Sequence, residues 1–224
     1  MSEPEFPRRQ VYVRRRGRMT RGQARALSEL REQFCINPER AEFAANAKPV
    51  GIEIGFGMGH ATLAWAQQRP DWTLFGIEVY EPGIGALMLQ LEEARIDNLR
   101  IIEADARTLF EEWLPAASID QINIFFPDPW PKKRHASRRI IQPDTLALFA
   151  SRLKESGSLR LATDWQPYAQ WMLECGNAEP SLTNVTPDGK FADRPAERPV
   201  TRFEQRGLRL GHGVWDLCYE KRAS

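Results

Sequence analysis

Cysteine and histidine are both scarce in this chain of 224 residues, with three copies of each. None of the cysteines forms a CxxC pair, which argues against a disulfide framework and against a zinc site. The histidines are scattered, so neither a metal cluster nor a serine or cysteine triad is indicated, and we expect no metal. The residues concerned are Cys35, Cys175, Cys218, His60, His135 and His212.

Long apolar runs are also missing. No run approaches the roughly 18 residues needed to span a bilayer, and the first ten residues, MSEPEFPRRQ, contain no apolar segment of the kind found in secretory signals. With 42% hydrophobic residues, the chain is long enough for one domain with a substantial core. The sequence therefore predicts a soluble cytoplasmic protein, built as one domain with a short appendage.

A large net charge is absent, but the charges are segregated along the chain. The formal charge is +1, yet residues 6–25 hold eight arginines and no acid, and residues 132–139, KKRHASRR, are basic again. Residues 78–112 hold nine acids and three arginines, a pattern more typical of a solvated face. Arginine forms paired hydrogen bonds to phosphate and stacks on bases, and in the first segment it is interleaved with apolar and aromatic residues. This arm predicts nucleic acid as the partner.

Short apolar segments alternate with helix-favouring segments through the middle of the chain. Near-continuous apolar strands linked by helices are typical of a parallel sheet covered on both faces, and right-handed crossovers then give a doubly wound α/β fold. The last two apolar segments have no full helix between them and predict an antiparallel C-terminal edge. The seven expected strands lie within residues 50–55, 73–79, 99–105, 120–126, 158–164, 181–187 and 208–221.

The N-terminal part is expected to differ from the rest. Apolar residues at helical spacing predict a helix over residues 20–34, directly after the arginine-rich segment. We therefore divide the chain into an arm with its helix, residues 1–33, and an α/β domain, residues 34–224. In such a domain, ligands bind outside the carboxyl ends of the strands.

The first expected strand runs into a glycine turn, EIGFGMGH, that leads into a helix. Gly55, Gly57 and Gly59 let the backbone approach a ligand closely, beside the free N–H groups of a helix N-terminus. The spacing G-x-G-x-G departs from the G-x-G-x-x-G of dinucleotide-binding proteins. Glu53 lies inside the strand, where a carboxylate needs a cationic partner, either a nearby arginine or the ammonium group of a bound amino acid.

Two further acids end the next two strands. Glu78 follows the glycines by about 20 residues, where nucleotide sites place an acid on ribose hydroxyls. Asp105 could accept a hydrogen bond from an adenine amino group, or it could be the N-cap of the helix that follows. An ammonium, a ribose and an adenine together describe S-adenosylmethionine. The conjunction of three acids with the glycine turn predicts that cofactor.

The order of these motifs resembles class I methyltransferases, and in particular the tRNA (guanine-N7)-methyltransferases of the bacterial TrmB type. The resemblance rests on EIGFGMGH, GIEVYEPGI, NLRIIEADA, FFPDPWPKKRH, LATDWQPY and RPVTRFEQRG, in family order from about residue 50 to residue 207. It implies methyl transfer from S-adenosylmethionine to N7 of a variable-loop guanine in tRNA. The cofactor contacts that it implies are Glu53, Glu78, Asp105 and Asp128, and the substrate contacts are Lys132, Asp164, Thr201, Arg202, Phe203 and Glu204.

Asp128 is the expected catalytic residue. Guanine N7 carries an in-plane lone pair and no hydrogen, so its methylation needs orientation and charge stabilisation rather than a base. A carboxylate at the mouth of a strand can accept from the N1–H and N2–H₂ edge and favour a purine that becomes cationic. Pro127 and Pro129 restrict the backbone around it. Trp130 either stacks on the target base or serves as a packing lid.

Several of these positions have a simpler explanation. Thr201 and Glu204 also form a T-x-x-E capping box, and Asp164 precedes a segment with Pro167 in its first turn, so helix capping accounts for them without a substrate. Two other functions remain open. A methyltransferase that acts on another kind of substrate with the same fold would bind that substrate with an affinity independent of salt. A non-catalytic RNA-binding module would bind RNA equally well with or without Asp128. The expected phosphate contacts beyond the arm are Lys132, Lys133, Arg134, Arg138 and Arg139.

Overall fold

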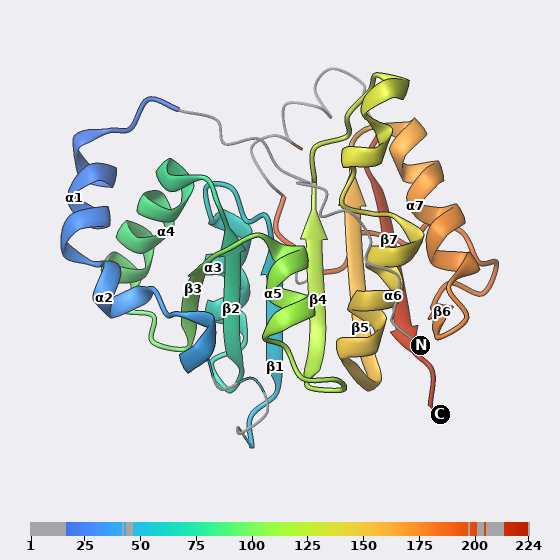
Figure 1. Cartoon of the computed structure of the whole chain (residues 1–224), viewed down its shortest axis with the longest axis horizontal. Helices are drawn as coiled ribbons and strands as arrows, with labels where there is room; N and C mark the ends of the chain where they lie inside the picture. The colour runs from blue at the N-terminus through green and yellow to red at the C-terminus, as the bar shows by residue number, and fades with distance from the viewer. Residues whose placement is uncertain are drawn as a thin grey trace, which may run out of the picture.

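The computed structural model describes residues 17–41, 43, 47–196, 198–200, 204 and 213–223. They form a seven-stranded sheet with the order β3-β2-β1-β4-β5-β7-β6 (Figure 1). The strands are β1 Val50–Ile54, β2 Thr73–Glu78, β3 Leu99–Glu103, β4 Ile119–Phe125, β5 Leu153–Thr163, β6 Leu182–Asn184 and β7 Trp215–Lys221. The first five are parallel, and β7 is antiparallel to β5 and β6. This is the predicted doubly wound α/β sheet with an antiparallel C-terminal edge.

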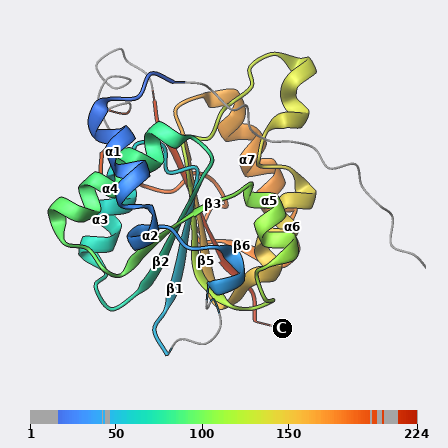
Figure 2. The same cartoon turned by 60° about the vertical axis from the view of Figure 1, so that its left-hand side comes forward.

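Helices cover both faces of the sheet, as the view in Figure 2 shows. Leu30, Trp65 and Leu87 belong to the buried cluster that α1 to α4 form on one face, while Phe149 and Tyr168 belong to the cluster on the other. The bounds are α1 Arg21–Glu29, α2 Arg31–Phe34, α3 His60–Gln68, α4 Glu81–Ala94, α5 Ala106–Glu112, α6 Pro143–Arg152 and α7 Gln166–Ala178, with 3-10 turns η1 Pro38–Arg40 and η2 Lys133–Arg138.

The helix expected over residues 20–34 is present, but it is divided at Leu30 into α1 and α2. Thr20 and Gln23 form a reciprocal capping box at its start. α1 packs on α4, where Gly85 permits a close approach, because a Cβ there would lie 2.7 Å from the backbone oxygen of Gln23. The arginine-rich segment before Gly17 lies outside the described residues.

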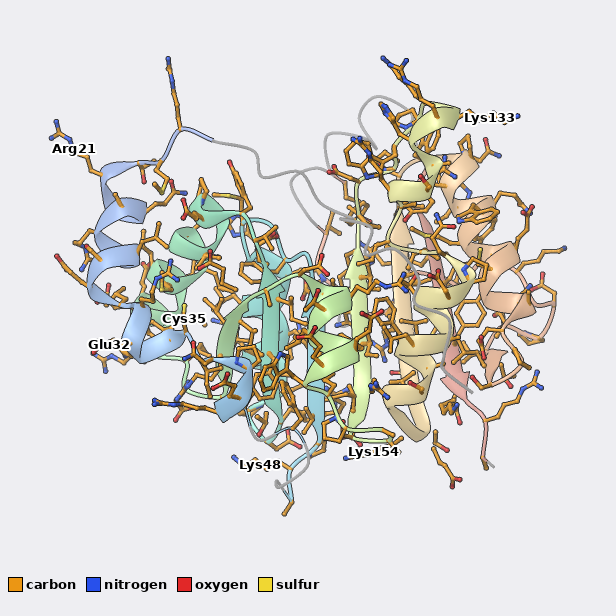
Figure 3. The ribbon with its side chains drawn as sticks, viewed as in Figure 1. Arg21, Glu32, Cys35, Lys48, Lys133 and Lys154 are labelled. Carbon is orange, nitrogen blue, oxygen red and sulfur yellow. The ribbon has the colours of Figure 1, made fainter. Side chains whose placement is uncertain are left out.

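The strand order reverses between β1 and β4, because the chain first moves outward to β2 and β3 and then continues on the other side with β4 and β5. Loops diverge at such a point and leave a crevice at the carboxyl ends of the strands. We call the side of the sheet at which the parallel strands β1 to β5 end the carboxyl edge. In Figure 3, Lys133 lies at the carboxyl edge, and Lys48 and Lys154 lie at the opposite edge.

Two classes of feature are absent from the described part of the chain. None of its helices combines the length and the apolar character that crossing a membrane requires. Within the same residues, no three His, Cys, Asp or Glu side chains are grouped so as to hold a metal ion.

Candidate active site

The glycine turn adopts a backbone that favours glycine at each of its three positions. The φ angles of Gly55, Gly57 and Gly59 are 72°, 57° and 79°, in the left-handed region where a Cβ is strained. A Cβ added at Gly55 or Gly57 would meet no atom within 4 Å, so both face open space. Gly59 is the N-cap of α3. The turn therefore leaves room for a ligand against bare backbone.

Glu78 ties the glycine turn to the end of β2. Its Oε2 accepts from the N–H of Gly57 at 2.9 Å, and its Oε1 accepts from the N–H groups of Val79 and Tyr80 at 2.8 and 3.1 Å. A carboxylate has about four lone-pair positions, so one remains for a hydroxyl of the ligand. Glu78 both shapes the turn and lies where the sequence predicts a ribose contact.

Glu53 is a buried acid with which no described cation pairs. It is 3% exposed, and no arginine of the described residues pairs with it, which favours the ammonium alternative. Burial raises its pKa to about 8, an effect that the nearby Thr62 hydroxyl partly offsets. Among the described residues, Oε2 of Glu53 has no hydrogen-bond partner, and neither has Oγ1 of Thr62. A bound ammonium group would supply the missing partner and favour the ionised carboxylate.

Asp105 fulfils one of its two predicted roles and remains able to fulfil the other. It is the N-cap of α5, with Oδ1 accepting from the backbone N–H of Thr108 at 3.0 Å. Its Oδ2 is buried and has no partner within the part of the chain that the structure describes. Two buried acceptors, on Glu53 and Asp105, thus await donors at one edge of the sheet. An ammonium and an adenine amino group are such donors, so the residues present fit S-adenosylmethionine.

The loop after β4 holds Asp128 at the surface of the carboxyl edge. Phe126 and Trp130, on either side of it, have positive φ angles of 52° and 43°, and Asp128 is exposed. Nε of Arg139 donates to the carbonyl of Pro129 at 2.9 Å, and its guanidinium lies over the rings of Trp165 and Tyr168, 5.4 and 5.1 Å from their centroids. Arg139 therefore supports this loop from within. In this it differs from the exposed cations of the basic run, residues 132–139, to which it belongs in the sequence.

Trp130 is packed by its own neighbours. The guanidinium of Arg138 lies 5.1 Å from its ring centroid, and His135 meets it edge-on at 5.8 Å. These contacts favour the packing lid over stacking on a target base. Desolvation lowers the pKa of His135, and the neighbouring Arg138, Arg134 and Lys132 lower it further. Lys132, Lys133 and Arg134 are exposed beside the loop and remain available to a polyanion.

The remaining predicted substrate residues have different surroundings. Asp164 is exposed, and the helix after it begins with Trp165 as N-cap and Pro167 in the first turn, without a side-chain cap. The capping interpretation of Asp164 is therefore wrong. Glu204 is buried, and both of its carboxylate oxygens accept from Arg198 at 2.7 and 2.9 Å. Thr201, Arg202 and Phe203 lie outside the described residues.

Sequence reasoning missed the partners that hold Glu204. Arg198 is 2% exposed and pairs with both Glu204 and Asp216. A signal for Asp216 existed, since an acid inside the apolar strand VWDLCYEK needs a cationic partner just as Glu53 does. Burial raises the pKa of Asp216, and Arg198 opposes this rise.

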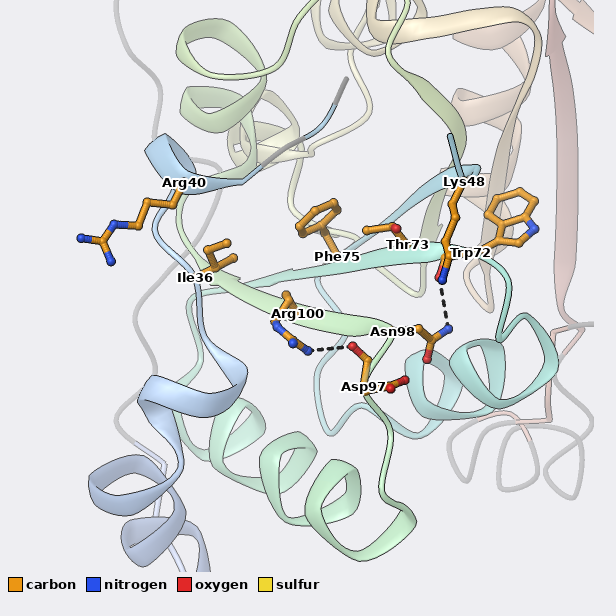
Figure 4. A pocket seen from close by; sticks show the side chains of 9 residues that line it. All are labelled: Ile36, Arg40, Lys48, Trp72, Thr73, Phe75, Asp97, Asn98 and Arg100. Carbon is orange, nitrogen blue, oxygen red and sulfur yellow. Dashed lines mark hydrogen bonds between the residues drawn. The ribbon is translucent and has the colours of Figure 1, made fainter. Parts of the chain in front are cut away.

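The fold brings most of the predicted residues to one edge. Glu53 is on β1, Glu78 ends β2, and Asp105, Asp128 and Asp164 follow β3, β4 and β5. A separate pocket of about 340 Å³ lies at the opposite edge, around the start of β2 and β3 (Figure 4). Its lining contains none of the predicted site residues.

Comparison with known proteins agrees with this arrangement. The family model described as "Putative methyltransferase" matches residues 47–217. A tRNA (guanine-N(7)-)-methyltransferase of Paraburkholderia xenovorans is 48% identical over 99% of this chain and 87% of its own length. That of an Acidovorax species is 50% identical over 94% of this chain and 85% of its own.

Solved structures show the same fold at low identity. The 16S rRNA methyltransferase KamB superposes with a TM-score of 0.54 at 15% identity, covering 92% of this chain and 96% of its own. An rRNA methylase of Streptococcus thermophilus gives 0.53 at 14% identity, covering 80% and 89%. A methyltransferase of Streptococcus mutans in complex with SAH gives 0.51 at 14%, covering 78% and 89%. The chain belongs to the bacterial tRNA (guanine-N7)-methyltransferases, which use S-adenosylmethionine as methyl donor.

Proposed function

We propose that this chain transfers the methyl group of S-adenosylmethionine to N7 of a guanine in the variable loop of tRNA, forming 7-methylguanosine. One observation carries the proposal beyond membership of the family. Two buried acceptors, on Glu53 and Asp105, receive no donor from any described residue, and they share the carboxyl edge with an exposed acid, Asp128, that lies beside exposed cations. Glu53 and Asp105 suit the methyl donor, whereas Asp128 and the exposed cations suit a nucleobase attached to a polyanion.

The cofactor is held by acceptors at the carboxyl edge that still have room for a donor. Glu53 accepts from the amino-acid ammonium, Glu78 from ribose hydroxyls and Asp105 from the adenine amino group. Gly55 and Gly57 let the ligand approach their bare backbone. When bound, S-adenosylmethionine supplies a methyl group already activated by the positive charge on sulfur.

Asp128 orients the guanine and compensates its charge. Its carboxylate accepts from N1–H and N2–H₂, which directs N7 toward the methyl group. The purine becomes positively charged as the new bond forms, and a nearby carboxylate stabilises that charge more than it stabilises the neutral base. No proton has to leave N7, so the site needs no general base. The restricted loop around Asp128, with Arg139 bound to Pro129, keeps the acid in place.

The rest of the substrate is held through its phosphates and the bases near the target. Lys132, Asp164 and residues 201–203 contact tRNA near the guanine, together with the exposed Lys133 and Arg134. Residues 1–33 form an arm and helix that grip the tRNA backbone, and residues 34–224 carry the chemistry. We place the reaction in the cytoplasm, and nothing in the sequence calls for a protein partner.

The test is to incubate the purified chain with labelled S-adenosylmethionine and unmodified tRNA, and to identify the labelled nucleoside. We expect 7-methylguanosine, with kcat reduced about 100-fold or more by Asp128→Ala. Asp128→Asn retains a hydrogen-bonding shape but not the charge, so it separates the two contributions. Asp71→Ala, a change at an exposed acid at the opposite edge, is the matched control. Near-normal turnover of Asp128→Ala would refute the role given to this acid.

A further inference from the structure

Arg198 forms four short hydrogen bonds although it is almost completely buried. Its Nε and Nη2 donate to the two carboxylate oxygens of Asp216 at 2.7 and 2.8 Å. Its Nη1 and Nη2 donate to those of Glu204 at 2.7 and 2.9 Å. One planar guanidinium therefore holds two carboxylates, each through a bidentate pair.

The same guanidinium lies over two aromatic rings at the end of β4. Its central carbon is 5.9 Å from the ring centroid of Phe125 and 5.4 Å from that of Phe126. Phe126 is two residues before Asp128 and is fixed to β5, since its N–H donates to the carbonyl of Ala162 at 2.8 Å. Arg198 thus contacts three separate parts of the chain: β7 through Asp216, the end of β4, and Glu204.

We propose that Arg198 is a positioning residue that holds Glu204 against the loop that carries Asp128. This inference rests on the proposed function. Glu204 then acts through Arg198 rather than by a direct contact to guanine, because both of its oxygens are bound to Arg198. Arg198 itself touches neither the methyl donor nor the base.

The chemistry of the cluster favours a geometric role. A buried ion-pair cluster contributes little net stability compared with apolar packing of the same volume, whereas its directional hydrogen bonds select one arrangement. Only arginine offers a flat set of donors that can hold two carboxylates at once, while lysine offers a single ammonium. Arg198→Lys therefore keeps the charge and removes the geometry.

The experiment measures kcat, the KM for each substrate and the melting temperature of Arg198→Lys with unmodified tRNA. We expect kcat to fall about 100-fold, as for a misplaced reacting group, while the KM for S-adenosylmethionine changes less than about threefold. Arg107→Lys is the matched control, because Arg107 also joins two carboxylates, at 2.7 Å to Glu111 and 2.6 Å to Asp144. We expect its kcat to stay within about twofold of wild type.

A cycle with Glu204→Gln separates anchoring from direct contact. If Glu204 acts through Arg198, the double variant Arg198→Lys, Glu204→Gln loses no more kcat than the more damaged single variant. Losses that multiply would overturn the proposal, and so would unchanged kcat in Arg198→Lys. If Arg198→Lys does not fold, Asp216→Asn takes its place and should reduce kcat while the KM for S-adenosylmethionine stays the same. Wild-type protein that forms no 7-methylguanosine would instead refute the proposed function, and this inference with it.

Discussion

Glu53 should make both folding and cofactor binding depend on pH. Its pKa is about 8 in the folded chain against an ordinary value of 4.5, because burial disfavours the charged form. The folded state therefore binds the proton more tightly than the unfolded state. Stability contributed by this group is fully present below about pH 4.5 and decreases as the pH rises toward 8, by about 1.4 kcal/mol per pH unit. Protein without ligand should lose roughly 3 kcal/mol between pH 5 and pH 7 from Glu53 alone.

Cofactor binding should show the opposite dependence. An ammonium group beside Glu53 favours the ionised carboxylate and lowers its pKa in the complex. At pH 7 about nine-tenths of the free protein carries a proton on Glu53, so binding should release about one proton. Between pH 6 and pH 7 the affinity for S-adenosylhomocysteine, which has the same ammonium, should increase about tenfold.

Two measurements check these values. Urea unfolding at pH 5 and pH 7 gives the stability, and titration calorimetry in two buffers of different ionisation enthalpy gives the number of protons released. Glu53→Gln is the control, because its neutral amide does not titrate. Its stability and its cofactor affinity should both depend less on pH than those of the wild type. Wild-type affinity that is independent of pH, with no proton release, would refute the placement of the ammonium beside Glu53.

Three further predictions concern other parts of the site. Gly57→Ala should cost about 1 kcal/mol of stability because φ is 57° there, and it should also reduce the affinity for S-adenosylmethionine because its Cβ enters the open space beside the turn. Gly189→Ala, at φ 66°, is the control and should cost similar stability without affecting that affinity. Equal losses of affinity in the two variants would contradict a cofactor contact at Gly57. Asp105→Asn should retain the N-cap to within about 0.5 kcal/mol. It should weaken cofactor binding about tenfold when its amide N–H₂, a donor, faces the adenine amino group, which is also a donor. An unchanged affinity in calorimetry would count against that contact. Deletion of residues 1–16 removes five arginines and keeps the Thr20 cap. The KM for tRNA should then rise far more than the KM for S-adenosylmethionine, and the salt dependence of tRNA binding should become less steep. Equal effects on both KM values would argue against tRNA binding by this segment.

Local sequence patterns predicted the scaffold well because each element depends on local chemistry. The apolar runs that became β1 to β4 are bounded by polar or glycine-containing segments, and the φ angles of Gly55, Gly57 and Gly59 are those that glycine favours. Asp105 was predicted as a possible cap because a short acid before a helix commonly accepts from its first N–H groups. Whether a second oxygen stays free cannot be read from that pattern, since it depends on what packs around it.

The features that sequence did not reveal depend on tertiary packing. Arg198 lies in a proline-rich segment where an arginine is ordinarily exposed, and its burial becomes apparent only when β7 and the end of β4 lie on either side. The sequence predicts Arg139 as a phosphate contact in a basic run, whereas in the structure it donates a hydrogen bond to the carbonyl of Pro129. Asp164 failed as a cap because the helix begins after Trp165, one residue later than the pattern suggested.

The central claim is methyl transfer to N7 of one guanine in tRNA, and a substrate lacking only that nitrogen tests it most directly. A tRNA carrying 7-deazaguanosine at the variable-loop guanine keeps the N1–H and N2–H₂ edge and replaces N7 with C–H. We predict that unmodified tRNA yields 7-methylguanosine at this position, while the deaza form binds competitively and receives no methyl group. Methylation of the deaza tRNA at an undiminished rate would contradict the account.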